Sequence, residues 1–262
     1  MKVKIGLGKP SIGILGLHGL GGTPANLEPF IKGFRKSSWK SFLVSLPTLP
    51  GFDRENWEQL KEITYQEWIT ASRQAYHNLR LDLNSTREKI KKIFIIGYSM
   101  GGLLAIIEAA FRRDDETLAG LILINPAIKE QNPWGWVLGT PVLRQIGKQF
   151  ISSVQIRGTP YQRDESEQTL PYVPTETIIQ LKSLQDLALK QAPLVRCPTL
   201  IIQGEKDETV KPSGAWELAL LLNNERVEIQ LVKGCDHYLT NILHQNMATK
   251  VMLNFINTID TH

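Results

Sequence analysis

The stretch that decides the fold is residues 91–111, KKIFIIGYSMGGLLAIIEAAF. Residues 93–96 form an apolar, β-branched run, which predicts a buried parallel strand. Residues 103–111 are rich in Ala, Leu and Ile, which predicts a helix that is buried on most of its faces. Between them, residues 97–101 read GYSMG, a G-x-S-x-G sequence. On such a strand-to-helix turn the central serine is held in a strained conformation with its hydroxyl exposed, so Ser99 is a candidate nucleophile.

A serine hydroxyl becomes a good nucleophile only when a base accepts its proton, and an acid must orient that base. The chain has five histidines, which are His18, His77, His237, His244 and His262. His237 is the best candidate because it follows an apolar strand expected over residues 227–232, and loops at the carboxyl ends of parallel strands gather the chemistry of such sheets. His77 and His244 fall in expected helices and His262 is the C-terminal residue, while His18 is expected to brace the neighbouring glycine loop.

The acid is expected in the loop GEKDETV, residues 204–210, which follows a short buried strand expected over residues 199–203. Asp207 is the preferred residue in this loop. Glu205 and Glu208 are close rivals, and Asp236, which is adjacent to His237, also stays open. The preferred order along the chain is Ser, then Asp, then His.

A fourth component must stabilise the negative charge that develops on the substrate oxygen. An apolar strand expected over residues 11–17 is followed by HGLGGTP, residues 18–24, whose glycines let the backbone approach a substrate closely. The backbone N–H groups of Leu20 and Met100 are the expected pair of donors, Met100 being the residue after the candidate nucleophile.

With these motifs in place, the chain resembles the α/β-hydrolase serine esterases. Within that family it looks most like small bacterial carboxylesterases and monoacylglycerol-lipase-like enzymes. The resemblance covers nearly the whole chain, through LGLHGLGGTPANLEPF (15–30), LPTLPGF (46–52), IIGYSMGGLLA (95–105), CPTLIIQGEKDETV (197–210) and the loop around residue 237.

The resemblance implies that Ser99 is the nucleophile, Asp207 the orienting acid and His237 the base, with the Leu20 and Met100 amides as the oxyanion hole. Two features depart from the family pattern. Asp236 stands where the family usually has Gly before the histidine, which places a charge beside the base, and LPGFD (49–53) replaces an LPGHG-type stretch at the mouth of the site.

The order of apolar and amphipathic segments predicts an α/β-hydrolase fold, a mostly parallel sheet of six or seven strands with helices on both faces and a small inserted cap. Strands are expected over residues 11–17, 41–45, 93–97, 119–124, 199–203 and 227–232, with one short extra strand within 3–7. Helices are expected over residues 24–36, 65–82, 101–112, 213–222 and 241–259. The long gap after residue 124 predicts a hydrolase core over 1–124 and 193–262 and a cap over 125–192.

The cap contains two groups of apolar residues. Most members of the first group, around Trp134 and Leu138, are expected to pack the cap onto the core, while these two residues are candidates for lining an acyl pocket over Ser99. The second group recurs at helical spacing and comprises Ile178, Leu181, Leu184 and Leu187. It predicts a helix whose apolar stripe faces either the core or the substrate.

Composition is that of a globular enzyme, with 42% hydrophobic and 21% charged residues among 262. The net charge of +4 is dispersed, so a nucleic-acid partner is unsupported, and no apolar run approaches the roughly 18 residues of a membrane-spanning helix. The N-terminal residues run directly into the glycine loop and are not expected to be a signal peptide. Cys197 and Cys235 are interpreted as reduced thiols, which favours a cytoplasmic location.

These features predict a serine carboxylic-ester hydrolase that acts through an acyl-enzyme on short- to medium-chain acyl esters or monoacylglycerols. Its partner is a small-molecule ester, and no cofactor or metal is expected because neither a metal-ligand spacing nor a dinucleotide fingerprint is found. A thioesterase, amidase, C–C hydrolase or acyltransferase could use the same residues. A non-catalytic binding protein of the same fold is a further alternative, against which the intact set of Ser99, Asp207 and His237 argues.

Overall fold

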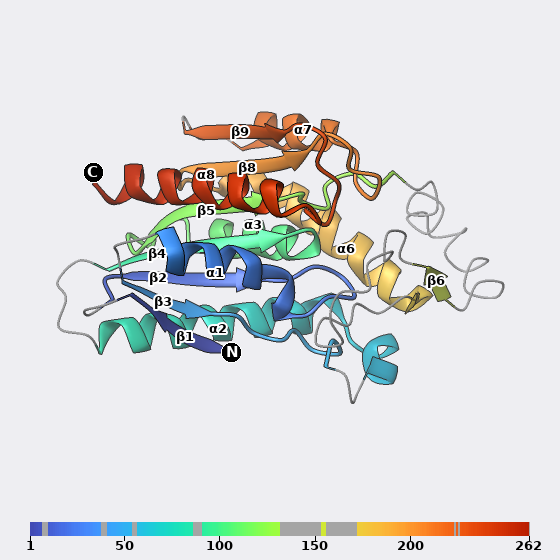
Figure 1. Cartoon of the computed structure of the whole chain (residues 1–262). Coiled ribbons are helices and arrows are strands. Elements are labelled where there is room, and N and C mark those ends of the chain that lie inside the picture. Colours follow the sequence, from blue (N-terminus) through green and yellow to red (C-terminus); the bar gives the residue numbers. More distant parts are fainter. Residues whose placement is uncertain are drawn as a thin grey trace.

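The computed structural model describes residues 1–6, 10–37, 41–53, 57–85, 91–131, 153–155, 172–222, 224 and 226–261. Its centre is a seven-stranded sheet with the strand order β1-β3-β2-β4-β5-β8-β9 (Figure 1). The strands are β1 (Lys2–Ile5), β2 (Ile12–Leu17), β3 (Phe42–Ser45), β4 (Lys92–Tyr98), β5 (Leu118–Ile124), β8 (Thr199–Gly204) and β9 (Val227–Val232). Neighbouring strands are parallel except at the edge, where β1 pairs antiparallel with β3.

Helices cover both faces of this sheet, as parallel strands buried on both sides require. They are α1 (Glu28–Ser37), α2 (Tyr65–Asn84), α3 (Met100–Phe111), α6 (Thr175–Gln191), α7 (Ser213–Leu221) and α8 (Ile242–Asp260), with short 3-10 helices η1 (Pro24–Leu27), η2 (Trp57–Lys61) and η3 (Ala192–Leu194). The α/β-hydrolase fold predicted from the sequence is therefore confirmed, and its strand number is seven.

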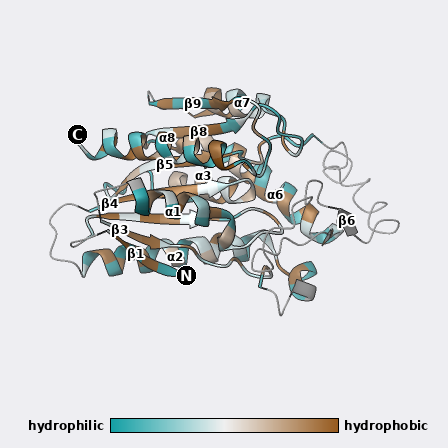
Figure 2. Cartoon of the chain, in the orientation of Figure 1, coloured by the Kyte–Doolittle hydropathy of each residue, from teal (hydrophilic) through white to brown (hydrophobic). Residues whose placement is uncertain are grey.

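Strand residues alternate between two apolar cores, one on each face of the sheet. In β4, Phe94 and Ile96 pack with α1 and α8, whereas Ile93 and Ile95 pack with α2 and α3. Figure 2 shows the result as apolar strands behind helices whose outward faces are hydrophilic. This double burial explains why the strands are continuous apolar runs in the sequence.

The carboxyl ends of β2, β4, β5 and β8 all point towards α6 (Figure 1). Loops that leave this edge therefore converge, although they are far apart in the sequence. A separate antiparallel pair, β6 (Ser153–Gln155) with β7 (Tyr172–Pro174), lies on the same side. Of the cap expected over 125–192, residues 132–152 and 156–171 lie outside the described residues, so its extent stays a prediction.

The helix predicted from Ile178, Leu181, Leu184 and Leu187 is α6. Its apolar stripe faces the core at one position and a cavity near Ser99 at another. Leu184 is fully buried in the core beside α3, whereas Leu181, one turn earlier, lines a cavity next to Ser99.

Candidate active site

Ser99 lies on the sharp turn between β4 and α3 with φ 53° and ψ −117°, a conformation that few non-glycine residues adopt. The flanking glycines are required by close packing. A Cβ on Gly97 would lie 2.4 Å from the carbonyl oxygen of Gly101, and a Cβ on Gly101 would lie 2.0 Å from that of Leu17. The turn can therefore form only with glycine at both positions, which is the physical basis of the G-x-S-x-G sequence.

Ser99, His237 and Asp207 form a hydrogen-bonded line across three loops of the sheet edge. His237 Nε2 lies 3.1 Å from Ser99 Oγ, and His237 Nδ1 lies 2.7 Å from Asp207 Oδ2. All three side chains are buried, with exposed fractions of 8% for Ser99, 4% for His237 and 2% for Asp207. In this arrangement Nδ1 donates to the carboxylate, so Nε2 is free to accept the proton of the serine hydroxyl.

The Asp207 carboxylate is fixed by four donors. Its Oδ1 accepts hydrogen bonds from the backbone N–H groups of Thr209 at 2.9 Å and Val210 at 2.8 Å. Its Oδ2 accepts from Gln203 Nε2 at 3.3 Å as well as from His237 Nδ1. These bonds hold the carboxylate in one orientation and leave it no freedom to turn away from the imidazole.

The three rival acids point elsewhere. Asp236 accepts hydrogen bonds from the backbone N–H of Thr240 at 3.1 Å and from its hydroxyl at 2.8 Å, so it shapes the loop after His237. Glu205 is exposed and accepts from the backbone N–H of Gly234 at 2.9 Å. Glu208 is exposed as well. Of the four acids considered, the geometry places only Asp207 against His237.

Two residues that the sequence did not single out hold His237 in place. Its carbonyl oxygen accepts hydrogen bonds from Tyr98 Oη at 3.0 Å and from Asn125 Nδ2 at 2.7 Å. Asn125 also accepts from the backbone N–H of Gly204 at 2.7 Å, and its own N–H donates to Ile202 O at 2.8 Å. One buried asparagine therefore joins the ends of β5 and β8 to the histidine loop.

Asn125 has a positive φ of 43°, a conformation in which asparagine is several times more frequent than most residues. The sequence did contain a signal, because an asparagine directly follows the apolar run of β5 and precedes Pro126. Its side-chain partners could not be found that way, since Gly204 and His237 are 79 and 112 residues away along the chain.

His18 is a structural residue, as expected. Its Nδ1 donates to Gly19 O at 2.9 Å, and its Nε2 accepts from the backbone N–H of Leu49 at 3.0 Å. Complete burial lowers the pKa of His18 to about 4, so the ring is neutral and joins the glycine loop to the loop after β3.

The glycine loop is a tight turn closed by the hydrogen bond from Gly22 N to Gly19 O at 3.2 Å. Gly21 has φ 67° in this turn, which favours glycine. The turn does not use the N–H of Leu20, and Met100 is the first residue of α3, whose N–H has no partner within the helix. Both residues line the cavity beside Ser99, where such N–H groups can bind an oxyanion.

A cavity of about 80 Å³ lies over Ser99 and His237. Its walls are mostly apolar, and the residues that contribute them are Leu20, Met100, Ala127, Leu181 and Val210. Asn26, Glu130, Thr209 and Tyr238 add polar groups. Trp134 and Leu138, the pocket residues suggested by the sequence, lie outside the described residues.

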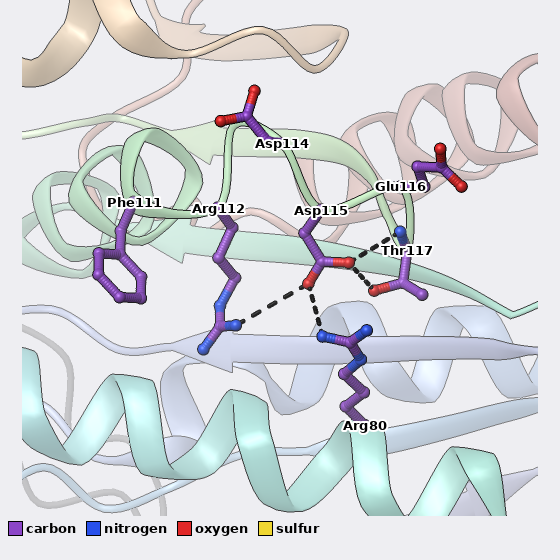
Figure 3. Close-up of a pocket in the computed structure, with 7 residues that line it drawn as sticks. All are labelled: Arg80, Phe111, Arg112, Asp114, Asp115, Glu116 and Thr117. Atoms are coloured by element: carbon purple, nitrogen blue, oxygen red, sulfur yellow. Dashed lines mark hydrogen bonds and ion pairs between the residues drawn. The ribbon is translucent and has the colours of Figure 1, made fainter.

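A second, wider hollow of about 530 Å³ lies at the opposite end of the sheet, between α2 and the connection from α3 to β5 (Figure 3). Its lining is largely charged, and Asp115 within it binds Arg80 at 3.1 Å and the N–H of Thr117 at 3.0 Å. The described residues contain no group of three His, Cys, Asp or Glu side chains that could hold a metal ion.

Comparison with known proteins identifies the family of this chain. Residues 14–241 match the family described as serine aminopeptidase, S33. The chain belongs to this family. One relative of this S33 chain is a thermostable monoacylglycerol lipase of Bacillus sp. (strain H-257), which is 24% identical over 93% of this chain and 90% of the relative. Another is the human monoglyceride lipase, which is 26% identical over 59% of this chain and 53% of the relative.

Solved structures show the same fold. A structure from the metagenome-derived lipolytic enzymes LipS and LipT superimposes with a TM-score of 0.76 at 21% identity, over 100% of this chain and 97% of the other. The monoacylglycerol lipase of Paleococcus ferrophilus superimposes with a TM-score of 0.73 at 17% identity, over 99% of this chain and 98% of the other. This S33 family member is a carboxylesterase-type hydrolase. None of the helices in the described part of the chain combines the length and apolar content needed to cross a bilayer.

Proposed function

We propose that this hydrolase cleaves carboxylic esters through a covalent acyl-enzyme on Ser99, with His237 as the base and Asp207 as the orienting acid. The observation that supports this most is the hydrogen-bonded line from Ser99 through His237 to Asp207, at 3.1 Å and 2.7 Å, beside a mostly apolar cavity. The strained φ of Ser99 adds support, because such strain concentrates at functional sites.

In the first half of the reaction, Ser99 Oγ attacks the ester carbonyl carbon while His237 Nε2 accepts its proton. The negative charge on the carbonyl oxygen is stabilised by the Leu20 and Met100 N–H groups, and Asp207 stabilises the imidazolium. The C–O bond to the alcohol then breaks, and His237 returns the proton to the departing alcohol oxygen. In the second half, water repeats the sequence against the acyl-enzyme and releases the carboxylic acid.

We place the substrate among esters of short to medium acyl chains or monoacylglycerols. The names of the Bacillus and human relatives support the second of these, and the apolar cavity wall that includes Leu181 supports an acyl chain. The family description names aminopeptidases, so amides are the second candidate class, and the same groups would also serve a thioester. Residues 125–192 would act as a cap, with Trp134 and Leu138 in its pocket wall. Two buried free thiols, Cys197 and Cys235, support a cytoplasmic location.

The test is covalent labelling combined with turnover of p-nitrophenyl butyrate. A fluorophosphonate should label the protein once, at Ser99, and Ser99→Ala should abolish labelling and lower turnover by several orders of magnitude. Ser213→Ala, at an exposed serine at the start of α7, is the matched control and should change neither. Labelling of a different serine, or full activity in Ser99→Ala, would overturn the proposal.

A further inference from the structure

Glu130 carries a carboxylate into the wall of the cavity over Ser99. Glu130 is the one carboxylate among the described lining residues, and apart from His237 its neighbours are apolar or neutral polar groups. The reaction proposed above does not use it. A half-buried carboxylate in a mostly apolar wall is costly to keep, so its place there calls for a functional reason.

The backbone of Glu130 is fixed to the loop that carries Asp207. Glu130 forms an antiparallel bridge with Val210, and Gln131 N donates to Thr209 O at 3.0 Å. Gln131 Nε2 also donates to the carbonyl oxygen of Asp207 at 3.0 Å. The position of Glu130 relative to the acid loop is therefore set by a short ladder, as in a sheet.

The side chain of Glu130 is fixed by a donor from α6. Gln185 Nε2 donates to Glu130 Oε1 at 3.1 Å and to Ala127 O at 2.8 Å, which uses both of its N–H groups. Gln185 is 1% exposed, so it has little freedom to move. Within the part of the chain that the structure describes, Glu130 Oε2 has no hydrogen-bond partner and is available to a ligand.

Glu130 lies on the side of the cavity where the alcohol of the ester must lie. The alcohol oxygen has to reach His237 Nε2 to receive its proton, so the alcohol lies on the His237 side of Ser99 and away from the oxyanion loop. Thr209 and Val210 line the cavity and donate to Asp207, the partner of His237, and Glu130 is bridged to Val210, so we place Glu130 on the His237 side.

We propose that Glu130 forms a subsite for the alcohol half of the substrate, in which Oε2 accepts a hydrogen bond from a hydroxyl group of that alcohol. The inference rests on the proposed esterase function and narrows it to esters of polyhydroxy alcohols. Gln185 is the positioning residue, because it holds the other carboxylate oxygen. A hydroxyl suits the site better than an ammonium ion does, since a charged group would lose far more hydration on entering a cavity of about 80 Å³.

The test compares two esters with the same acyl group and the same three-carbon alcohol, 1-butyrylglycerol and propyl butyrate. They differ only by the two hydroxyl groups. The quantity measured is the ratio of their kcat/KM values in the wild-type enzyme and in Glu130→Gln, which keeps the shape and removes the charge. We expect the ratio to fall roughly tenfold in Glu130→Gln. Gln185 donates to Oε1, so the amide oxygen of the new glutamine should take that position and its NH₂ group the Oε2 position, where it cannot accept a hydrogen bond from a hydroxyl group.

The matched control is Glu116→Gln, which makes the same chemical change at the opposite end of the sheet (Figure 3). It should leave the ratio unchanged. Both rates come from one protein preparation, so any loss of folded enzyme cancels from the ratio, and a destabilised variant still gives an answer.

Each outcome decides the matter. An unchanged ratio in Glu130→Gln would overturn the subsite, and so would a ratio that falls equally in Glu116→Gln. Butyrylcholine provides a cationic alcohol, and a selective loss of its hydrolysis in Glu130→Gln would show that the subsite binds cations instead of hydroxyl groups. Failure of the wild-type enzyme to hydrolyse any of the three esters would overturn the proposed function itself.

Discussion

Replacing Asp207 with asparagine should disable the base without disturbing the fold. The side chain keeps its size, and one of its two positions must now carry an NH₂ group. Oδ1 faces two backbone donors, from Thr209 and Val210, whereas Oδ2 faces His237 Nδ1 and the weaker donor Gln203. The amide oxygen will therefore occupy the Oδ1 position, and the new NH₂ group will face the imidazole.

This orientation reverses the hydrogen bond at His237. An NH₂ group needs an acceptor, so Nδ1 must give up its proton and the neutral imidazole must carry it on Nε2. Nε2 then presents an N–H to Ser99 Oγ across the 3.1 Å contact and cannot accept the serine proton. We expect kcat to fall by about 10³- to 10⁴-fold, which corresponds to about 4–5.5 kcal/mol of barrier.

The assay is steady-state hydrolysis of p-nitrophenyl butyrate, with thermal unfolding measured on the same samples. Asp236→Asn is the control, because an asparagine there can still accept from the backbone N–H of Thr240 while the Thr240 hydroxyl turns to suit the other atom. It should change kcat by less than about fivefold, since it leaves the contacts of His237 intact. A larger loss in Asp236→Asn than in Asp207→Asn would refute the reasoning and reassign the acid.

Three further outcomes follow from the structure. Asn125→Ala and Asn125→Gly should both lower kcat/KM by about tenfold or more, because the His237 carbonyl loses a donor. The free energy of unfolding should be about 1 kcal/mol higher for Asn125→Gly than for Asn125→Ala, because glycine adopts φ 43° without strain. Because burial lowers the pKa of His18 to about 4, the unfolded chain binds a proton that the folded chain does not bind between pH 6.5 and about 4. The free energy of unfolding should therefore fall by up to about 3 kcal/mol over this range as the pH drops. Denaturation curves measured across the range should show a smaller fall in that free energy for His18→Asn than for the wild-type protein. Along a p-nitrophenyl ester series, kcat/KM should rise about fourfold per methylene until the pocket ends, with no jump on emulsion; rapid hydrolysis confined to emulsified long-chain triacylglycerol would contradict this.

Most of the fold could be predicted from the sequence because its strands are buried on both faces and are therefore continuous apolar runs. The segments around Ile93 and Leu200 are recognisable as strands for this reason, and the helices between them are recognisable from their period and composition. The order of Ser99, Asp207 and His237 then placed three loops at one edge of the sheet, and the structure does bring these side chains into contact. Parallel topology fixes which loops meet, so the sequence alone is enough to place these three loops together.

Tyr98 and Glu130 act through contacts that no local sequence pattern encodes. Tyr98 occupies a variable position of the G-x-S-x-G sequence, and only the folded chain brings its hydroxyl to the His237 carbonyl. Glu130 follows β5 in an unremarkable stretch, and its place in the cavity wall depends on a bridge to Val210 and a donor from Gln185. The contacts of such side chains can be identified only in the folded chain, where the neighbouring loop and helix are both in position.

The loops at the carboxyl edge of the sheet, around Ser99 and His237, share strained backbone conformations. The described residues include three non-glycine residues with positive φ, which are Ser99 at 53°, Asn125 at 43° and Leu239 at 48°. All three lie where the loops after β4, β5 and β9 meet, and each conformation costs on the order of 1–3 kcal/mol. The bonds of Asn125 to the β8 end and the His237 loop, together with the packing of Leu239 in the core, oppose that cost. The sheet edge therefore holds Ser99, and Asn125 and Leu239 on either side of the His237 loop, in conformations that their own sequence would not favour, and this positions the 3.1 Å contact between Ser99 and His237 before a substrate arrives.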